Sequence, residues 1–326
     1  LDGLPERLQL PTDRPRPAAA TTPDRVPFTV DASTHRAVEE LARRCSATPF
    51  MVVHSALAAT LAVLTGVDDI AVGTPVSGRG DPVLDDLVGM FVGTIVLRTR
   101  VDPSVSFADL VSSTRVADLA AFAHSEQPFD RVVDAVAPTR SITHHPLFQV
   151  MLAYQNFTEP EIRFDDVTVR SRDTPSSVSR YDLEIEIRER RAEDGTAAGL
   201  DGVIAYPTEL FDRATIGRWS RLLQRLLQAA VADPSVAVGD LDVLEPSEAA
   251  DLVPARGEVA LSPVTLPELL RGNSHDVAVR CGDDELTYRQ LDERANRLAR
   301  NLIRRGIGPE DAVALLLPRS VDSVAA

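Results

Sequence analysis

The sequence predicts an α/β fold, because segments with the periodicity of strands alternate along the chain with segments that have the periodicity of helices. The apolar run from Leu147 to Leu152 is bounded by polar residues, which is typical of a fully buried strand. Residues 180–187 alternate apolar and acidic side chains, so this segment is predicted to be a half-buried strand. Residues 50–64 are apolar on nearly all sides, which predicts a helix buried in the core.

The chain has 326 residues, a length that suggests about two domains, and its formal net charge is −15. An acidic chain repels phosphate groups, so we expect neither nucleic acid nor a membrane among its partners. No apolar run approaches the roughly 18 residues of a membrane span, and no signal peptide is recognisable, so we expect a cytoplasmic protein. Cys45 and Cys281 lie far apart without metal-binding or redox spacing, which predicts two buried, unpaired thiols and no metal site.

The N-terminal segment, residues 1–25, contains five prolines between Pro5 and Pro23 and is therefore predicted to be an extended connector. A short strand is expected at 26–30. A helix at 34–46 follows, which Asp31 or Ser33 can cap.

The buried helix at 50–64 has a proline at its first turn, Pro49, and a glycine just past its end, Gly66, as helices prefer. His54 lies on this apolar helix and is expected to be a satisfied core residue rather than a ligand. The other elements expected in this domain are strands at 70–75, 87–98 and 202–206, helices at 107–124, 131–136 and 213–232, and a hairpin loop at 188–200. Trp219, on the last helix, is expected in the core.

The segment from Arg140 to Met151 carries the pattern R-x-x-x-x-H-P-L-F-Q-V-M. This pattern resembles the seventh core motif of the condensation domains of nonribosomal peptide synthetases. Residues 87–98, LVGMFVGTIVLR, resemble the fifth core motif of the same family, although Gly93 stands where the family usually has Asn. Residues 124–129, HSEQPF, resemble the sixth motif, and the strand at 180–187 resembles a further family strand through Asp182.

The resemblance implies the C-terminal lobe of a condensation domain, an open α/β sandwich like that of chloramphenicol acetyltransferase. By resemblance, the loop from Gly78 to Phe91 covers the floor of a substrate tunnel, and a segment after Asn156 latches the lobe onto its N-terminal counterpart. The residues expected to line the tunnel are Gly89, Phe91, Val92, Gly93, Asn156, Ser179 and Arg180. The residues that match family motifs are Arg98, His124, Pro128, Phe129, Arg140, His145, Pro146, Leu147, Phe148, Gln149 and Asp182.

The catalytic motif of the family, H-H-x-x-x-D-G, is not found in this sequence. The only histidine pair is His144-His145, which is followed by Pro146 and belongs to the seventh motif. We therefore expect no catalytic residue in this chain, and we interpret His145 as a residue at the start of a strand.

The last part of the chain resembles the first two core regions of adenylation domains, which are adenylate-forming enzymes. A short helix is expected at 265–271, a hairpin at 277–288, a long helix to about Arg305 and a buried strand at 312–317. The predicted organisation is therefore a condensation lobe at 1–245, a linker at 246–261 and the start of an adenylation domain at 262–326. No phosphate-binding loop is present, so ATP and Mg are expected only in a complete adenylation domain.

The resemblance implies a fragment of a synthetase whose condensation domain forms amide bonds between acyl groups held as thioesters on 4'-phosphopantetheine. Its expected partners are carrier protein domains and the adjacent synthetase domains, and the fragment alone is expected to be inactive. Two alternatives stay open at this point. One is an epimerization-type sister domain, and the other is a non-catalytic module that docks carrier proteins or neighbouring domains.

Overall fold

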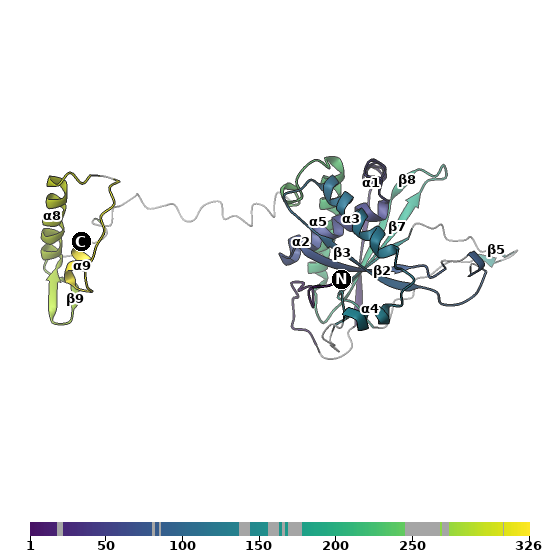
Figure 1. Ribbon diagram of the computed structural model, residues 1–326, viewed down its shortest axis with the longest axis horizontal. Coiled ribbons are helices and arrows are strands. Elements are labelled where there is room, and N and C mark those ends of the chain that lie inside the picture. The colour runs from purple at the N-terminus through teal and green to yellow at the C-terminus, as the bar shows by residue number, and fades with distance from the viewer. Residues whose placement is uncertain are drawn as a thin grey trace. The chain divides into compact units, whose positions relative to one another are not determined.

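In the computed structural model the chain divides into two compact units, Leu1–Pro246 and Ser247–Ala326 (Figure 1). The residues described are 1–17, 22–79, 82–84, 86–136, 144–155, 163–164, 167–168, 178–244, 268, 274–308 and 310–326. The predicted linker at 246–261 lies outside them, as does the predicted helix at 265–271 apart from Glu268.

The first unit is built on a six-stranded mixed sheet in the order β1-β8-β7-β4-β2-β3. Its strands are β1 (Pro23–Val30), β2 (Asp69–Val76), β3 (Gly93–Arg100), β4 (Val150–Gln155), β7 (Leu183–Arg191) and β8 (Ala197–Pro207). Strand β4 runs parallel to both β2 and β7, and the other neighbours are antiparallel. A separate two-stranded pair joins β5 (Arg163–Phe164) to β6 (Val167–Thr168).

Helices cover both faces of this sheet, as Figure 1 shows. The helices of the first unit are α1 (Ala32–Arg44), α2 (Pro49–Thr65), α3 (Phe107–Phe122), α4 (Phe129–Val136) and α5 (Arg213–Ala232), with the 3-10 turns η1 (Pro82–Leu84) and η2 (Val238–Asp240). Helices α1, α2 and α5 contribute to the main core on one face. Helix α4 packs on a smaller cluster of side chains that includes Ala71, Val96 and Met151.

The helix ends follow local chemistry that the sequence predicts. The Asp31 side chain accepts hydrogen bonds from the backbone N–H groups at the start of α1. Thr48 caps α2, with Pro49 in the first turn, and Gly66 ends the helix in the left-handed conformation at φ 70°. The predicted roles of Asp31, Pro49 and Gly66 are confirmed, as is the predicted extent of α5.

Two glycines in the sheet leave room for aromatic rings. A Cβ added to Gly73 on β2 would overlap the Phe148 ring, and one added to Gly202 on β8 would overlap the Phe28 ring. Each ring therefore lies directly on a strand, where any larger residue would displace it.

Four expectations for this unit are wrong. The strand expected at 87–98 begins only at Gly93, because residues 87–92 belong to the loop between β2 and β3. The strand expected from Leu147 begins only at Val150, because Leu147 has a left-handed backbone at φ 66° and the residues before β4 form a turn. The hairpin loop expected at 188–200 is shorter, since the β7 and β8 strands pair up to Arg191 and Ala197. Cys45 is half-buried rather than buried.

The second unit contains a hairpin, β9 (Val277–Cys281) and β10 (Asp284–Thr287), followed by α8 (Tyr288–Arg304) and α9 (Val321–Ala325). Thr287 and Gln290 form a capping box at the start of α8, which fixes the predicted boundary between strand and helix. Among the described residues of this unit, three large apolar side chains form a small core, Leu286, Leu291 and Val321.

The strand predicted at 312–317 is wrong, because these residues form no ladder and the Leu316 side chain is fully exposed. Its apolar run has no covering element among the described residues, and a strand without a pairing partner is not stable. Among the residues of α8, Leu291 alone is buried. Cys281 is exposed, contrary to expectation.

Of the helices described, none is individually long and apolar enough to cross a membrane, although α1 and α2 taken together, with a 105° bend, meet the length and composition of a broken span.

Candidate functional site

One end of the sheet gathers the predicted tunnel residues of the fifth motif. Strands β2, β4 and β7 run in the same direction, so their carboxyl ends lie at the same end of the sheet. Gly93, the first residue of β3, pairs with Val76 at the carboxyl end of β2. The loop between β2 and β3, residues 77–92, carries Gly89, Phe91 and Val92 to this end. Asn156 directly follows β4 and lies outside the described residues.

Arg79 holds this loop in shape. Its Nη2 donates a hydrogen bond to the Leu87 carbonyl at 2.6 Å, and its Nη1 donates to the Leu84 carbonyl. The guanidinium lies 4.2 Å from the centre of the Phe91 ring, within the range of a cation–π contact. Gly78 has no space for a side chain, because a Cβ there would overlap the Phe91 carbonyl oxygen.

The tip of the loop is apolar and faces solvent. Val88 and Met90 are fully exposed, and Leu87 and Val92 are more than half exposed. A contiguous group of exposed apolar side chains marks a surface for a ligand or a partner rather than a free surface. The family motif identified the apolar residues of this loop, but no motif singles out Arg79.

The opposite end of the sheet holds the other predicted residues. Ser179 and Arg180 precede β7, whose first residue, Leu183, pairs with Val150 at the start of β4. Arg98 is level with this end and lies five residues along β3 from Gly93, about 17 Å at about 3.3 Å per residue. The structure therefore does not bring Ser179 and Arg180 together with the residues of the loop.

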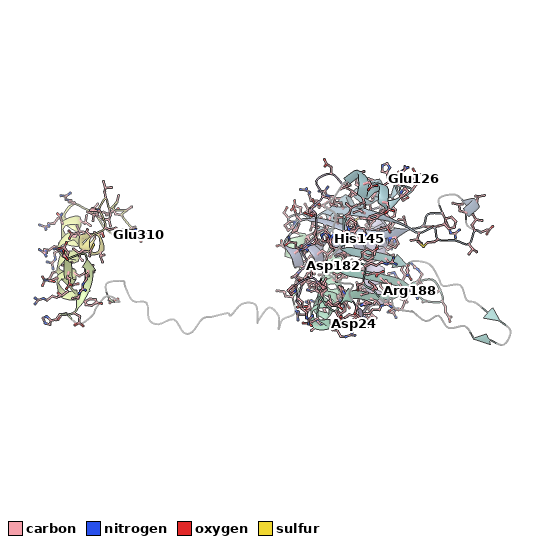
Figure 2. The ribbon with its side chains drawn as sticks, turned by 90° about the horizontal axis from the view of Figure 1, so that it is seen from below. Asp24, Glu126, His145, Asp182, Arg188 and Glu310 are labelled. Atoms are coloured by element: carbon pink, nitrogen blue, oxygen red, sulfur yellow. The ribbon has the colours of Figure 1, made fainter. Side chains whose placement is uncertain are left out.

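His145 and Phe148 of the seventh motif form an aromatic cluster at this end with Phe129 and Tyr181. The His145 ring lies 4.3 Å from Phe148, 5.0 Å from Tyr181 and 5.3 Å from Phe129 between ring centres. Burial lowers the pKa of His145 and raises the pKa of the Tyr181 hydroxyl. His145 is thus a neutral, half-buried part of a packed cluster, and Figure 2 labels it in the first unit.

The polar motif residues also lie at this end. Arg98, Gln149 and Asp182 each bond to the N-terminal segment, residues 1–17. Arg140 lies outside the described residues.

His124 of the sixth motif ends a helix and lines a pocket. It follows α3 and donates its backbone N–H to the Ala121 carbonyl at 3.0 Å, as a residue that closes a helix does. The pocket, of about 370 Å³, is bounded by β3, α3 and α4, and its lining includes Phe129 and Arg98.

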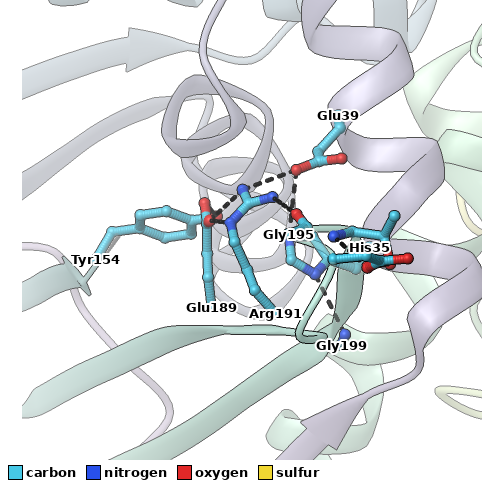
Figure 3. Close-up of polar contacts among 9 residues, drawn as sticks. His35, Glu39, Tyr154, Glu189, Arg191, Gly195 and Gly199 are labelled. Atoms are coloured by element: carbon cyan, nitrogen blue, oxygen red, sulfur yellow. Dashed lines mark hydrogen bonds and ion pairs between the residues drawn. The ribbon is translucent and has the colours of Figure 1, made fainter. Parts of the chain in front are cut away.

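A partly buried polar network links β4 to the β7–β8 hairpin and to α1 (Figure 3). The Tyr154 hydroxyl donates to Glu189 at 2.8 Å, and Arg191 binds both Glu189 and Glu39, the latter at 2.8 Å. Burial is the main cause of the raised pKa of the Tyr154 hydroxyl, and the Glu189 charge adds to it. The network fixes the position of β4 close to where the predicted tunnel residue Asn156 follows.

Three side chains in and beside this network are of the types that bind metal ions. Ligand atoms of His35, Glu39 and Glu189 all lie within 4.8 Å of one another. However, the Arg191 guanidinium binds both carboxylates and supplies the positive charge that they require. The His35 Nδ1 accepts the Gly199 N–H at 3.2 Å, which leaves the ring proton on Nε2, the nitrogen that faces Glu39. This group is therefore better described as a hydrogen-bonded network than as a metal centre.

The sequence matches two protein families. Residues 1–253 match the condensation domain, and residues 268–326 match the AMP-binding enzymes. Among curated proteins, the chain is 41% identical over 329 residues to a dimodular nonribosomal peptide synthase of Bacillus subtilis strain 168, covering 99% of this chain and 14% of that protein. It is 40% identical over 337 residues to the isonitrile lipopeptide synthase of Mycobacterium tuberculosis, covering 100% and 13%. The chain thus spans less than a third of the length of these relatives.

Solved structures give the same assignment of the fold. The X-domain from teicoplanin biosynthesis superposes with a TM-score of 0.70 at 27% identity, covering 74% of this chain and 55% of that domain. The four-domain nonribosomal peptide synthetase AB3403 superposes with a TM-score of 0.68 at 23% identity, covering 93% of this chain and 24% of that one. The predicted fold, the open α/β sandwich of a condensation domain, is confirmed. The chain belongs to the nonribosomal peptide synthetases, as the C-terminal lobe of a condensation domain followed by the start of an adenylation domain.

Proposed function

We propose that the first unit forms one wall of the tunnel in which a condensation domain makes amide bonds. In this reaction the amine of one carrier-bound aminoacyl thioester attacks the carbonyl carbon of another carrier-bound thioester. The C–N bond forms, the C–S bond breaks, and the donor carrier leaves as a thiol. The observation that carries the proposal is the loop at 77–92, where Arg79 holds an exposed apolar tip beside Gly93.

The chain supplies no general base in this proposal. A base must reach the amine and be able to accept its proton. His145, the second histidine of the pair in this sequence, is enclosed by aromatic rings, and its pKa is lowered by burial. The amine proton is therefore accepted by a group of the condensation domain outside this chain.

The thioesters are carried on the 4'-phosphopantetheine arms of carrier domains, which with the adjacent synthetase domains are the proposed partners. ATP and Mg bind only in a complete adenylation domain, because residues 262–326 contain no phosphate-binding loop. The exposed apolar tip of the loop at 77–92 meets the substrate or the opposite lobe. The residues proposed to line the tunnel are Gly89, Phe91, Val92, Gly93 and Asn156, with Ser179 and Arg180 near the opposite end of the sheet.

The comparisons do not favour the alternative readings of an epimerization-type domain or a docking module. The condensation family covers residues 1–253, and an AMP-binding enzyme follows at 268–326. The curated relatives named above are synthetases.

The test uses the parent synthetase, because its adenylation domain provides an internal control for folding. Gly93→Trp fills the rim beside the loop, where a new side chain has ordinary contacts with Val76. We expect condensation to fall by about a hundredfold, as for other misplacements near reacting groups, while adenylation stays unchanged. The matched control is Thr29→Trp, an exposed residue on the opposite edge strand β1.

Two results would contradict the proposal. Condensation that survives Gly93→Trp would remove the loop from the tunnel wall. A dipeptide formed when the 326-residue chain alone is mixed with loaded donor and acceptor carriers would show that the chain does contain a base.

A further inference from the structure

The first 17 residues form a strap across the amino ends of β2, β4 and β7, and residues 1–17 are called the N-terminal strap from here on. The strap contains no helix or strand, yet it contacts the lobe from β3 to α5. Leu8 and Leu10 are buried in the main core. Apolar burial attaches a segment without fixing its direction, so the course of the strap depends on its polar contacts.

The first polar contact is Arg98, on β3. Its Nη1 donates to the Asp2 carbonyl at 2.7 Å, and its Nη2 donates to the Gly3 carbonyl at 3.2 Å. The same guanidinium makes a bidentate ion pair with Asp69 at 2.8 and 2.6 Å. Because Asp69 fixes the plane of the guanidinium, the remaining N–H groups are aimed at the strap.

The second contact is Gln149, just before β4, which is almost completely buried. Its Oε1 accepts the Leu8 N–H at 2.6 Å, and its Nε2 donates to the His145 carbonyl at 3.0 Å. One amide side chain thus satisfies a buried backbone donor and a partly buried backbone acceptor. Loss of the Gln149 amide would remove the partner of both backbone groups and so weaken the attachment of the strap.

The third contact is Asp182, just before β7, which is buried and forms a two-point ion pair with Arg16. The Nη1–Oδ1 distance is 2.7 Å, and Nη2 bonds to the second carboxylate oxygen. The Arg16 side chain is only 17% exposed, so solvent screens this pair little. Figure 2 shows Asp182 in the same lobe as His145.

Between these last two contacts the strap also binds the first turn of α5. The Asp13 carboxylate accepts the Asp212 N–H at 2.8 Å and the Thr215 hydroxyl at 3.0 Å. The N-cap residue of α5, Asp212, makes no side-chain capping bond of its own. The strap therefore satisfies the backbone N–H of the N-cap residue from outside the helix, the bond that the N3 side chain makes in a capping box.

We propose that Arg98, Gln149 and Asp182 are positioning residues that hold the N-terminal strap at three points across the sheet. In doing so they fix where the polypeptide reaches this lobe from the rest of the condensation domain. This inference rests on the proposed function, in which the opposite wall of the tunnel lies outside this chain. The three residues come from three separate sequence motifs, and each bonds to the strap rather than to the loop at 77–92.

The test measures amide hydrogen exchange in the 326-residue chain for the wild type and for Arg16→Gln, Asp182→Asn and Gln149→Met. We expect exchange of the Leu8 amide to rise by about tenfold or more in Gln149→Met, since 1.4 kcal/mol corresponds to a factor of ten. Amides in the centre of β4 should keep their protection. The double variant of Arg16 and Asp182 should resemble either single variant, because both remove the same ion pair.

The matched control is Asp201→Asn, which removes an exposed ion pair with Arg190 on the same sheet and should leave the strap unchanged. If Asp182→Asn unfolds the lobe, Arg16→Gln tests the same pair from its more exposed side.

A second measurement compares condensation with adenylation in the parent synthetase carrying Gln149→Met. We expect condensation to fall while adenylation is unchanged. Strap amides that exchange at the wild-type rate in all three variants would show that these residues do not hold the N-terminal strap. A loosened strap with undiminished condensation would overturn its link to the tunnel. A wild-type parent synthetase without condensation activity would refute the proposed function. The exchange result would still decide whether the positioning residues hold the N-terminal strap.

Discussion

At the scale of single residues, the partners of His35 decide its protonation state. The ring is completely buried, and its Nδ1 already accepts the Gly199 N–H. Glu39, Glu189 and Arg191 are the charged groups that face it, and burial outweighs the two carboxylates, so the pKa of His35 is lowered. A histidine that takes up a proton in the unfolded chain before it does so in the folded chain destabilises the fold in acid.

We therefore expect the lobe to lose stability as pH falls below about 6.5, the ordinary pKa of histidine, because only the unfolded chain then takes up the proton. His35→Gln keeps an acceptor for the Gly199 N–H and should reduce this slope. The half-buried His145, whose pKa burial also lowers, should account for part of the remainder. Urea unfolding between pH 8 and 5 measures it, with exposed His275→Gln as the control. An undiminished slope in His35→Gln would contradict the assignment.

At the scale of elements, the loop at 77–92 shows how a segment without regular ladder bonds can still have a defined shape. Arg79 supplies two hydrogen bonds to loop carbonyls and a face for Phe91. A planar guanidinium can satisfy all three contacts at once, whereas an ammonium cannot. The apolar tip is therefore presented by a polar support beneath it.

Arg79→Lys is expected to loosen this loop even though it keeps the charge. Amide exchange within residues 86–92 should rise by about tenfold, the equivalent of one or two lost hydrogen bonds at 1.4 kcal/mol per factor of ten. Exchange in β2 should stay at the wild-type rate, and Arg100→Lys, whose side chain is largely exposed, serves as the control. Equal protection of the loop in Arg79→Lys and the wild type would show that the charge alone is sufficient.

The elements that sequence predicted well are those with a local cause. Helices α2 and α5 have clear apolar patterns, and Gly66 provides a stop signal. The predicted start of β4 was wrong, because nothing in the sequence indicates that Leu147 adopts the left-handed backbone conformation. Residues 312–317 have the apolar character of a buried strand, but burial depends on covering elements that local sequence does not specify.

Sequence predicted which residues belong to the candidate site better than it predicted where they lie relative to one another. The family motifs identified Gly93, Arg98, Gln149 and Asp182, but the sheet register decides which end of the sheet each one occupies. Pairing between strands that are distant in sequence leaves little trace in any one of them. Arg79 and the network around Arg191 depend on tertiary contacts in the same way.

At the scale of the whole molecule, the two compact units differ in how much core they contain. The first unit buries side chains from all six strands and from α1, α2, α3 and α5, whereas the described core of the second consists of Leu286, Leu291 and Val321. A small core supports only marginal stability. The stability of the chain is therefore expected to reside in Leu1–Pro246.

Truncation after Pro246 should leave the main thermal transition within about 2 °C of its original midpoint, a shift equivalent to less than about 1 kcal/mol for a domain of this size. Differential scanning calorimetry of the full and truncated chains measures this. A larger fall in the midpoint would mean that the second unit stabilises the first.

The strap also affects the order in which the lobe can form during protein synthesis. Its anchors pair residues separated by 141, 166 and 202 positions along the chain. At about 5–20 residues per second, the strap leaves the ribosome roughly 10–40 s before Thr215 exists to receive Asp13. The strap is thus made before the rest of this lobe but is among the last of its segments to dock. Until it docks, Leu8 and Leu10 lack the apolar surroundings that they have in the folded lobe.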